Sequence, residues 1–160
     1  MKVNKFLLID DFVDDISSHL ESIFNGGFTD VTDGVNVFKN IQDRGLDIVS
    51  ESVTEMLNEY DVAYNFVRRS PENQQDPNFI HSDEMMGDLT CLLYLNQDHP
   101  KDDGTTIYEC EEDIPSVVFK SKLNRMVIFD SKLKHSRNIF DNFGQGDKAR
   151  LVQVIFLKLK

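Results

Sequence analysis

Apolar and polar residues alternate along several short stretches of the chain, which is the pattern of strands with one buried face. In residues 88–96 the two faces differ, because one is wholly apolar and the other mixes apolar with polar residues. The apolar face comprises Leu89, Cys91, Leu93 and Leu95, and the mixed face comprises Thr90, Leu92, Tyr94 and Asn96. Further strands are predicted over residues 6–12, 61–69, 105–110, 117–120, 125–130 and 150–159. About eight short strands with turn residues between them predict a jelly roll, also called a double-stranded β-helix.

Two helices are predicted in the first part of the chain, because apolar residues recur there at helical spacing. The first begins at Asp14 or Asp15, either of which can cap its amino end, and a Gly-Gly pair stops it. The second runs over residues 47–58. His19 lies in the first helix on a largely polar stretch without partner residues near it in the sequence, so we expect it at the surface.

Length and composition fit a single domain with a core of its own. The chain has 160 residues, a mass of 18.4 kDa and 40% hydrophobic residues. Residues 1–60, with the two helices and a hairpin over 28–43, are expected to support a jelly-roll core formed by residues 61–160. The predicted fold class is therefore mainly β with N-terminal helices.

Charge and cysteine content narrow the range of partners. The net charge is −11 and the isoelectric point is near 4.7, which disfavours nucleic acid because that binding depends on lysine and arginine at phosphates. Cys91 and Cys110 are too few for a disulfide framework. The apolar run at residues 6–9 is too short for a signal peptide or a membrane span. We expect a soluble, cytoplasmic protein without a membrane partner.

The residues with the clearest chemistry are two histidines and an aspartate. Alternate side chains of an extended segment point the same way, so His81 and Asp83 can reach one ion while Ser82 faces away. His135, on a distant strand, can supply a third ligand. Two imidazoles and one carboxylate suit an iron(II) centre with open positions, whereas a structural zinc site usually has four ligands. The His-x-Asp motif alone is a weak signal, since aspartate is abundant in this chain.

The order of the motifs after His-x-Asp strengthens this signal. Residues 90–96 read Thr-Cys-Leu-Leu-Tyr-Leu-Asn, which resembles the T-C-x-x-Y-L-N strand of the oxygen-sensing prolyl hydroxylases. Residues 124–131 lead into His135 and resemble the strand and turn before the distal histidine of that family. Over about its last hundred residues, the chain resembles the 2-oxoglutarate-dependent iron(II) dioxygenases, and within them the prolyl-4-hydroxylase-like group.

This resemblance implies an activity and its cofactors. His81, Asp83 and His135 would hold iron(II), and 2-oxoglutarate would bind there as co-substrate. Oxygen would be used to hydroxylate an unactivated C–H bond, with release of succinate and CO2, and ascorbate can serve as a reductant. Family members that halogenate lack a carboxylate at the position of Asp83, so the resemblance implies hydroxylation here.

Two more residues are implied to bind 2-oxoglutarate. Tyr94 matches the family tyrosine that contacts the co-substrate, and Arg150 matches the basic residue that receives its far carboxylate. From the residues alone, Tyr94 could equally be a core tyrosine whose hydroxyl bonds to backbone.

The chain departs from the family pattern in two places. Asp103 and Gly104 stand where the family commonly has two glycines, which leaves the local turn geometry open. The gap between His135 and Arg150 is longer than in many members. Lys148 and Arg137 therefore remain alternatives to Arg150 as the carboxylate anchor.

A polar, proline-bounded loop over residues 70–78 precedes the His-x-Asp motif. In prolyl hydroxylases the loop at this place closes over the substrate. The resemblance therefore places Arg68 and Arg69 at the mouth of the site as substrate-binding residues. A solvated loop with two surface arginines is an equal alternative.

The substrate class follows from the resemblance only in outline. Similarity in the tyrosine strand favours a prolyl or other amino-acid or peptidyl side chain, and small chains of this type also modify small molecules. A cupin-type metal-binding barrel without oxidative chemistry, or a degenerate binding module, is the alternative function. Arg150 together with Tyr94 distinguishes the two readings, because such a barrel has no reason to position them. The sequence leaves the oligomeric state open.

Overall fold

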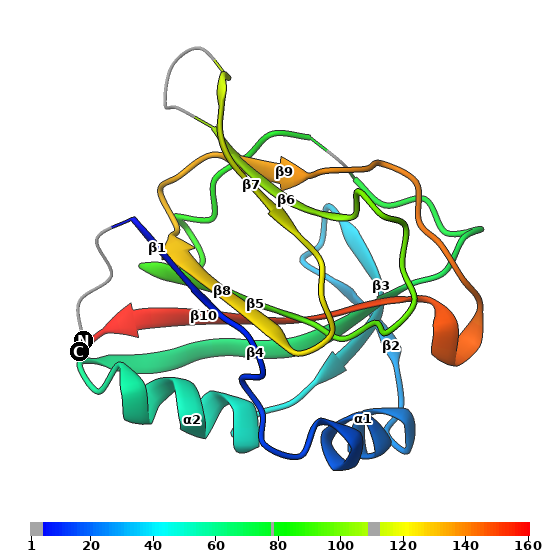
Figure 1. The fold of residues 1–160 in the computed structure, drawn as a ribbon, viewed down its shortest axis with the longest axis horizontal. Helices are drawn as coiled ribbons and strands as arrows, with labels where there is room; N and C mark the ends of the chain where they lie inside the picture. The colour runs from blue at the N-terminus through cyan, green and yellow to red at the C-terminus, as the bar shows by residue number, and fades with distance from the viewer. Residues whose placement is uncertain (1–4, 78, 109–112) are drawn as a thin grey trace.

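The computed structural model of the protein describes residues 5–77, 79–108 and 113–160 (Figure 1). Cys110 and the end of the strand predicted over 105–110 lie outside these residues. The helices are α1 (Ile16–Phe24), α2 (Ile48–Met56) and the short 3-10 helix η1 (Gly146–Lys148). The strands are β1 (Phe6–Ile9), β2 (Thr29–Thr32), β3 (Val37–Asp43), β4 (Tyr60–Ser70), β5 (Leu89–Tyr94), β6 (Gly104–Tyr108), β7 (Pro115–Lys120), β8 (Arg125–Asp130), β9 (His135–Arg137) and β10 (Arg150–Leu159).

The strands form two antiparallel sheets that face each other. The larger sheet has the order β1-β8-β5-β10-β4-β3-β2, and the smaller has the order β7-β6-β9. Figure 1 shows the smaller sheet over one face of the larger one, while α1 and α2 cover the opposite face. The neighbours β1-β8, β8-β5, β5-β10 and β10-β4 are far apart in sequence, as the jelly-roll connection requires. The predicted mainly β jelly roll with two supporting helices is confirmed.

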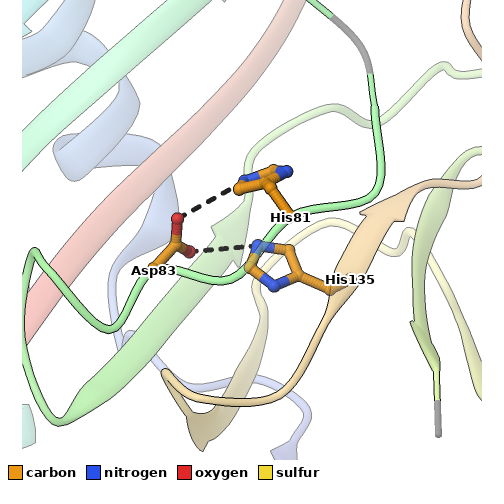
Figure 2. A group of neighbouring side chains, drawn as sticks. All are labelled: His81, Asp83 and His135. Atoms are coloured by element: carbon orange, nitrogen blue, oxygen red, sulfur yellow. Dashed lines mark ion pairs between the residues drawn. The ribbon is translucent and has the colours of Figure 1, made fainter. Parts of the chain in front are cut away.

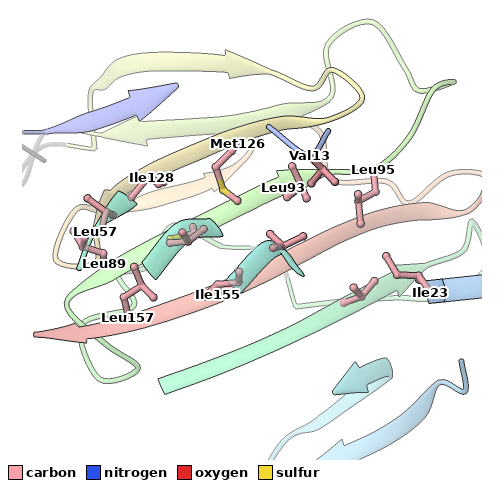
Figure 3. Close-up of a cluster of buried hydrophobic side chains, with 14 of the residues drawn as sticks. Val13, Ile23, Leu57, Leu89, Leu93, Leu95, Met126, Ile128, Ile155 and Leu157 are labelled. Carbon is pink, nitrogen blue, oxygen red and sulfur yellow. The ribbon is translucent and has the colours of Figure 1, made fainter. Parts of the chain in front are cut away.

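The two faces of β5 pack as their alternation predicts. Its apolar face joins a buried cluster with residues of both helices and of β10, part of which Figure 3 shows. Its other face points between the sheets, where Tyr94 packs in a second cluster with Phe119, Phe129 and Val152. Burial of apolar side chains on both faces fixes the register of the central strands. The space between the sheets is therefore the interior in which a site can form.

Both helices begin at the aspartates that the sequence suggests. The Asp15 side chain accepts a hydrogen bond from the main-chain N–H of Ser18, at 3.0 Å. Asp47 and Ser50 form a reciprocal capping box at the start of α2. The caps satisfy main-chain donors that the first turn leaves unpaired.

The expectation that His19 lies at the surface is wrong. Its side chain is buried, with 3% of the residue exposed, and its Nε2 lies 2.7 Å from Oε1 of Gln153. His19 falls on the same face of α1 as Ile16 and Ile23, which faces the larger sheet. Its partner is far away in sequence on β10, so no local pattern could reveal it.

The first part of the chain contributes strands as well as helices to the sheet. β1 pairs with β8 at one edge, and the predicted hairpin over 28–43 forms β2 and β3 at the other edge. The Asp33 carboxylate accepts hydrogen bonds from the main-chain N–H groups of Val35 and Asn36 and thereby shapes the hairpin turn. The short 3-10 helix η1 lies directly before β10. Among the described residues, no helix is long and apolar enough to cross a membrane.

Candidate metal centre

Main-chain pairing brings His81 and His135 together. The N–H of His81 donates to the carbonyl of His135 at 3.0 Å, and the N–H of His135 donates to the carbonyl of His81 at 2.8 Å. The N–H of Asp83 donates to the carbonyl of Ser131 at 2.9 Å. The segment containing the His-x-Asp motif thus extends the edge of β9, and all three predicted ligands reach one place.

The three side chains converge as Figure 2 shows. The Oδ2 atom of Asp83 lies 3.0 Å from Nε2 of His135, and Oδ1 lies 3.4 Å from Nε2 of His81. One ligand atom from each residue lies within 4.8 Å of the other two. An ion at the centre of such a triangle would have protein ligands on one side only, which leaves positions for other molecules.

Main-chain carbonyls fix which nitrogen of each imidazole faces the cluster. Nδ1 of His81 lies 2.9 Å from the Phe79 carbonyl, and Nδ1 of His135 lies 3.1 Å from the Leu133 carbonyl. A carbonyl only accepts, so each Nδ1 carries a hydrogen. Nε2 is then the nitrogen of each ring that faces Asp83, and it can bind a metal once it is unprotonated. This is the usual outer-shell arrangement of metal-bound histidine. The donor set and its tautomers therefore fit a divalent metal such as iron(II).

The electrostatics of the cluster favour an ionised carboxylate. Burial alone would raise the pKa of Asp83, but hydrogen bonds with His135 and His81 outweigh it and hold the pKa well below its usual range. The hydrogen bond to Asp83 raises the pKa of His81. Ionised Asp83 is the form that binds a cation.

A cavity of about 170 Å³ opens beside the three residues. Its lining comprises the three candidate ligands, apolar residues of the larger sheet, and three arginines. The arginines are Arg68 on β4, Arg137 on β9 and Arg150 on β10. Lys148 is exposed in η1 and is not part of the lining, so the structure does not bring it to the site.

Arg150 is buried and already has an acidic partner. Its Nε lies 3.3 Å from Oδ1 of Asp103, which is itself buried and accepts a hydrogen bond from Ser121 at 2.7 Å. Gly104 adopts a φ of +150°, and a Cβ there would collide with the Phe119 carbonyl oxygen. Of the two positions at which the family commonly has glycine, this chain keeps Gly104, where the close approach to Phe119 requires it. At the other position, Asp103 places a carboxylate beside Arg150.

Tyr94 bonds to a side chain rather than to backbone. Its hydroxyl lies 2.6 Å from Oγ1 of Thr105, and Thr105 lines the cavity. Burial raises the pKa of Tyr94 to about 12, so the phenol stays neutral. Tyr94 therefore lies behind the cavity wall in the described structure, with Thr105 between it and the open space.

The structure brings Arg68 to the cavity but not Arg69. Successive residues of β4 point to opposite faces, and the Arg69 guanidinium lies over the Phe28 ring, 4.1 Å from its centroid. Nη2 of Arg68 lies 2.9 Å from Oδ1 of Asp76 in the loop that follows β4. The polar loop thus folds back over the cavity mouth and supplies a counter-charge there.

Three residues at the site were not anticipated from the sequence: Phe79 and Thr105, which line the cavity, and Asp76, which pairs with Arg68. Phe79 lines the mouth, and its ring centroid lies 5.2 Å from that of His81. Its place follows from the alternation that puts residues 79, 81 and 83 on one side, so this signal was available. Thr105 carries no local signal, because its partner Tyr94 lies on another strand, and no pattern in the polar loop marks Asp76 as the partner of Arg68.

Comparisons with known proteins agree on the fold. No protein-family profile and no curated protein matches the sequence. A prolyl hydroxylase from Trichoplax adhaerens, solved with a hypoxia-inducible-factor peptide fragment, superposes with a TM-score of 0.67 at 16% identity, over 97% of this chain and 84% of that one. The epimerase SnoN, solved with Fe3+, alpha ketoglutarate and nogalamycin RO, gives 0.64 at 10% identity, over 96% and 78%. A viral collagen prolyl hydroxylase from Paramecium Bursaria Chlorella virus-1 gives 0.60 at 13% identity, over 98% and 91%. The chain therefore has the jelly-roll fold found in 2-oxoglutarate/iron(II) oxygenases.

Proposed function

We propose that the protein is an iron(II)- and 2-oxoglutarate-dependent dioxygenase that hydroxylates a C–H bond and releases succinate and CO2. The observation that carries this proposal is the His81, Asp83 and His135 cluster, with both Nε2 atoms directed toward Asp83, beside a cavity that contains Arg150. A fold shared with oxygenases supports it. Residues 1–160 would act as one catalytic domain.

Each group of residues has a distinct task in this proposal. His81, Asp83 and His135 hold the metal, and Arg150 receives the far carboxylate of 2-oxoglutarate by charge-assisted hydrogen bonds. Bound iron(II) supplies oxygen activation coupled to oxidative decarboxylation of 2-oxoglutarate. Leu92, Val152 and Val154 form an apolar wall that limits water in the cavity. Ascorbate would keep the metal reduced between turnovers.

A peptidyl or free amino-acid side chain, with proline first, is the proposed substrate class. Phe79 is 60% exposed at the cavity mouth and offers an aromatic surface for a ring such as that of proline. Arg68 lies at the same cavity and can hold a substrate carbonyl or carboxylate. The net charge of −11 argues against nucleic acid as a partner. A cytoplasmic location goes with this proposal, since iron(II) and a reduced Cys91 both suit a reducing compartment.

Binding measured without oxygen tests the proposal against a cupin-type barrel. Titration of 2-oxoglutarate into the metal-loaded protein should show binding at one site, and Asp83→Ala should lose the metal and the co-substrate together. His99→Ala is the matched control, because this histidine lies in a loop away from the cluster. Metal binding without any 2-oxoglutarate binding would favour the non-oxidative barrel.

A further inference from the structure

We propose that Arg137 is a second anchor for the far carboxylate of 2-oxoglutarate. Asp103 neutralises the charge of Arg150, and Arg137 supplies a positive charge in its place. This inference rests on the proposed function. It concerns a residue on the smaller sheet, whereas Arg150 lies on the larger one. The two arginines would hold the carboxylate from both sides of the jelly roll.

The charge of Arg150 is not free to balance an incoming anion. Asp103 is 2% exposed and Arg150 is 8% exposed, so their ion pair at 3.3 Å is removed from water. A buried pair of this kind is neutral as a unit. A carboxylate that binds Arg150 alone would add one uncompensated negative charge beside Asp103, and burial of an unpaired charge is costly.

Arg68 is also compensated. Its guanidinium forms an ion pair with Asp76, whose side chain is only 5% exposed. The pair closes the cavity near the loop after β4. Arg68 therefore brings no net positive charge to the interior.

Arg137 differs from the other two because its partners are neutral. Nη1 donates to Oδ1 of Asn142 at 2.6 Å, and Nη2 donates to the main-chain carbonyl of Asp141 at 3.3 Å. Its Nε is buried without a hydrogen-bond partner in the described part of the chain. Of the carboxylates in that part, none forms an ion pair with Arg137. Among the described residues that line the cavity, Arg137 is thus the arginine without an ion pair. Its Nε needs an acceptor, as do Nε and Nη2 of Arg68, so the missing counter-charge is what distinguishes Arg137.

The position of Arg137 suits a ligand that extends from the metal cluster. Arg137 follows His135 by two residues on β9, so the two side chains point to the same side about 7 Å apart along the strand. Arg137 pairs in register with Thr105, whose hydroxyl bonds to Tyr94. A dicarboxylate that chelates at the cluster can therefore place its far end among Arg137, Thr105 and Arg150.

The charges of this group balance only when Arg137 is included. Arg150 and Asp103 cancel each other, and Arg137 then matches the single negative charge of the far carboxylate. Lys148 cannot take this role, because it is exposed outside the cavity. The same charge balance predicts that, once Asp103 is removed, Arg137 is no longer needed for 2-oxoglutarate binding.

A binding experiment with two ligands isolates this role. The protein is loaded with manganese(II) without oxygen, and dissociation constants are measured calorimetrically for 2-oxoglutarate and for pyruvate, a 2-oxo acid without the far carboxylate. Arg137→Gln should weaken 2-oxoglutarate binding about tenfold or more and leave pyruvate binding unchanged. Lys148→Gln is the matched control and should change neither. Equal loss for both ligands would assign Arg137 a merely structural role and overturn the proposal.

Rescue by a second substitution provides an independent check. Asp103→Asn in the Arg137→Gln background should restore most of the lost 2-oxoglutarate affinity, because Arg150 is then uncompensated. If that double variant does not fold, Arg137→Lys provides the same check, since it keeps the charge and should keep affinity within a fewfold. Wild-type affinity for 2-oxoglutarate in Arg137→Gln would contradict the inference alone. Absence of 2-oxoglutarate binding in the unmodified protein would instead contradict the proposed function.

Discussion

His81 and His135 exchange both of their main-chain hydrogen bonds, at 3.0 and 2.8 Å, although they lie in separate parts of the sequence. The pairing fixes the distance between the two imidazoles before any metal binds. Their ring centroids lie 4.4 Å apart, and both Nδ1 atoms donate to carbonyls. The cluster is therefore preorganised, and little conformational entropy remains to be lost on metal binding.

Metal binding should stabilise the folded protein. A divalent ion bound only by the folded state raises the free energy of unfolding by about 2.7 kcal/mol when its free concentration is about 100 times the dissociation constant. Thermal unfolding with and without iron(II) or manganese(II), under anaerobic conditions, measures the effect.

Substitution of the metal ligands distinguishes stabilisation by metal bound at the cluster from unspecific metal binding. Asp83→Ala and His81→Ala should each abolish the metal-dependent shift, while His99→Ala should retain it. A shift that persists in both ligand variants would place the metal elsewhere.

Gly104 should tolerate no side chain. Its φ of +150° disfavours any other residue, and a Cβ would meet the Phe119 carbonyl oxygen on the paired strand. We expect Gly104→Ala to lower the free energy of unfolding by about 3 to 5 kcal/mol, measured by urea denaturation. Gly27→Ala is the control, because a Cβ at Gly27 meets no atom within 4 Å. Equal stability of the two variants would show that β6 can move away from β7.

Protonation of His19 should destabilise the fold. Gln153 donates through its Nε2 to Asp47 and Asn65, so its Oε1 accepts from Nε2–H of His19. Nδ1 of His19 is then bare, buried and without a hydrogen-bond partner among the described residues. Burial lowers the pKa of His19 below its usual 6.5, more than the hydrogen bond to Gln153 raises it.

The sign of the resulting pH dependence follows directly. Above pH 6.5 His19 is neutral in the folded and unfolded states, and its contribution to stability is complete. As the pH falls through 6.5, the unfolded state takes up the proton first, so the free energy of unfolding declines until the folded-state pKa is reached. His19→Gln should remove this decline in urea titrations of the metal-free protein. His81 is present in both proteins, so an identical slope in the two would contradict the assignment.

Tyr94 should contribute to both co-substrate affinity and stability. Tyr94→Phe removes the hydroxyl bonded to Thr105 at 2.6 Å and keeps the ring in its cluster. We expect a loss of about 1 kcal/mol in the free energy of unfolding and a fewfold weaker binding of 2-oxoglutarate. Thr105→Val removes the other hydroxyl and should have a similar effect. A variant with unchanged 2-oxoglutarate affinity would assign this hydroxyl pair to the core alone.

The alternation of residues 88–96 was sufficient to predict which side of β5 meets the helices and which faces the interior. The same rule places Arg68 and Arg69 on opposite faces of β4. Alternation along the strand was therefore enough to show that both side chains could not lie at the mouth of the site. His19 could not be placed correctly, because its burial depends on Gln153.

Sequence patterns could not predict which carboxylates neutralise the arginines of the cavity. Asp103 lies just before β6 and Arg150 lies on β10, so only the fold brings them together. Asp76 lies in the loop after β4, but no sequence pattern marks it as the partner of Arg68. The departure at Asp103 was visible as an unusual residue, but its partner was not. Ion pairs between distant segments require the three-dimensional arrangement.

The fate of dioxygen tests the central claim most directly. The iron(II)-loaded protein is supplied with 2-oxoglutarate, ascorbate and isotopically heavy oxygen gas, and succinate is analysed by mass spectrometry. We predict that succinate forms and carries one heavy oxygen atom in its new carboxylate, and that none forms with Asp83→Ala. Failure of the folded, iron-loaded protein to form labelled succinate, although it binds 2-oxoglutarate, would contradict the assignment as a dioxygenase.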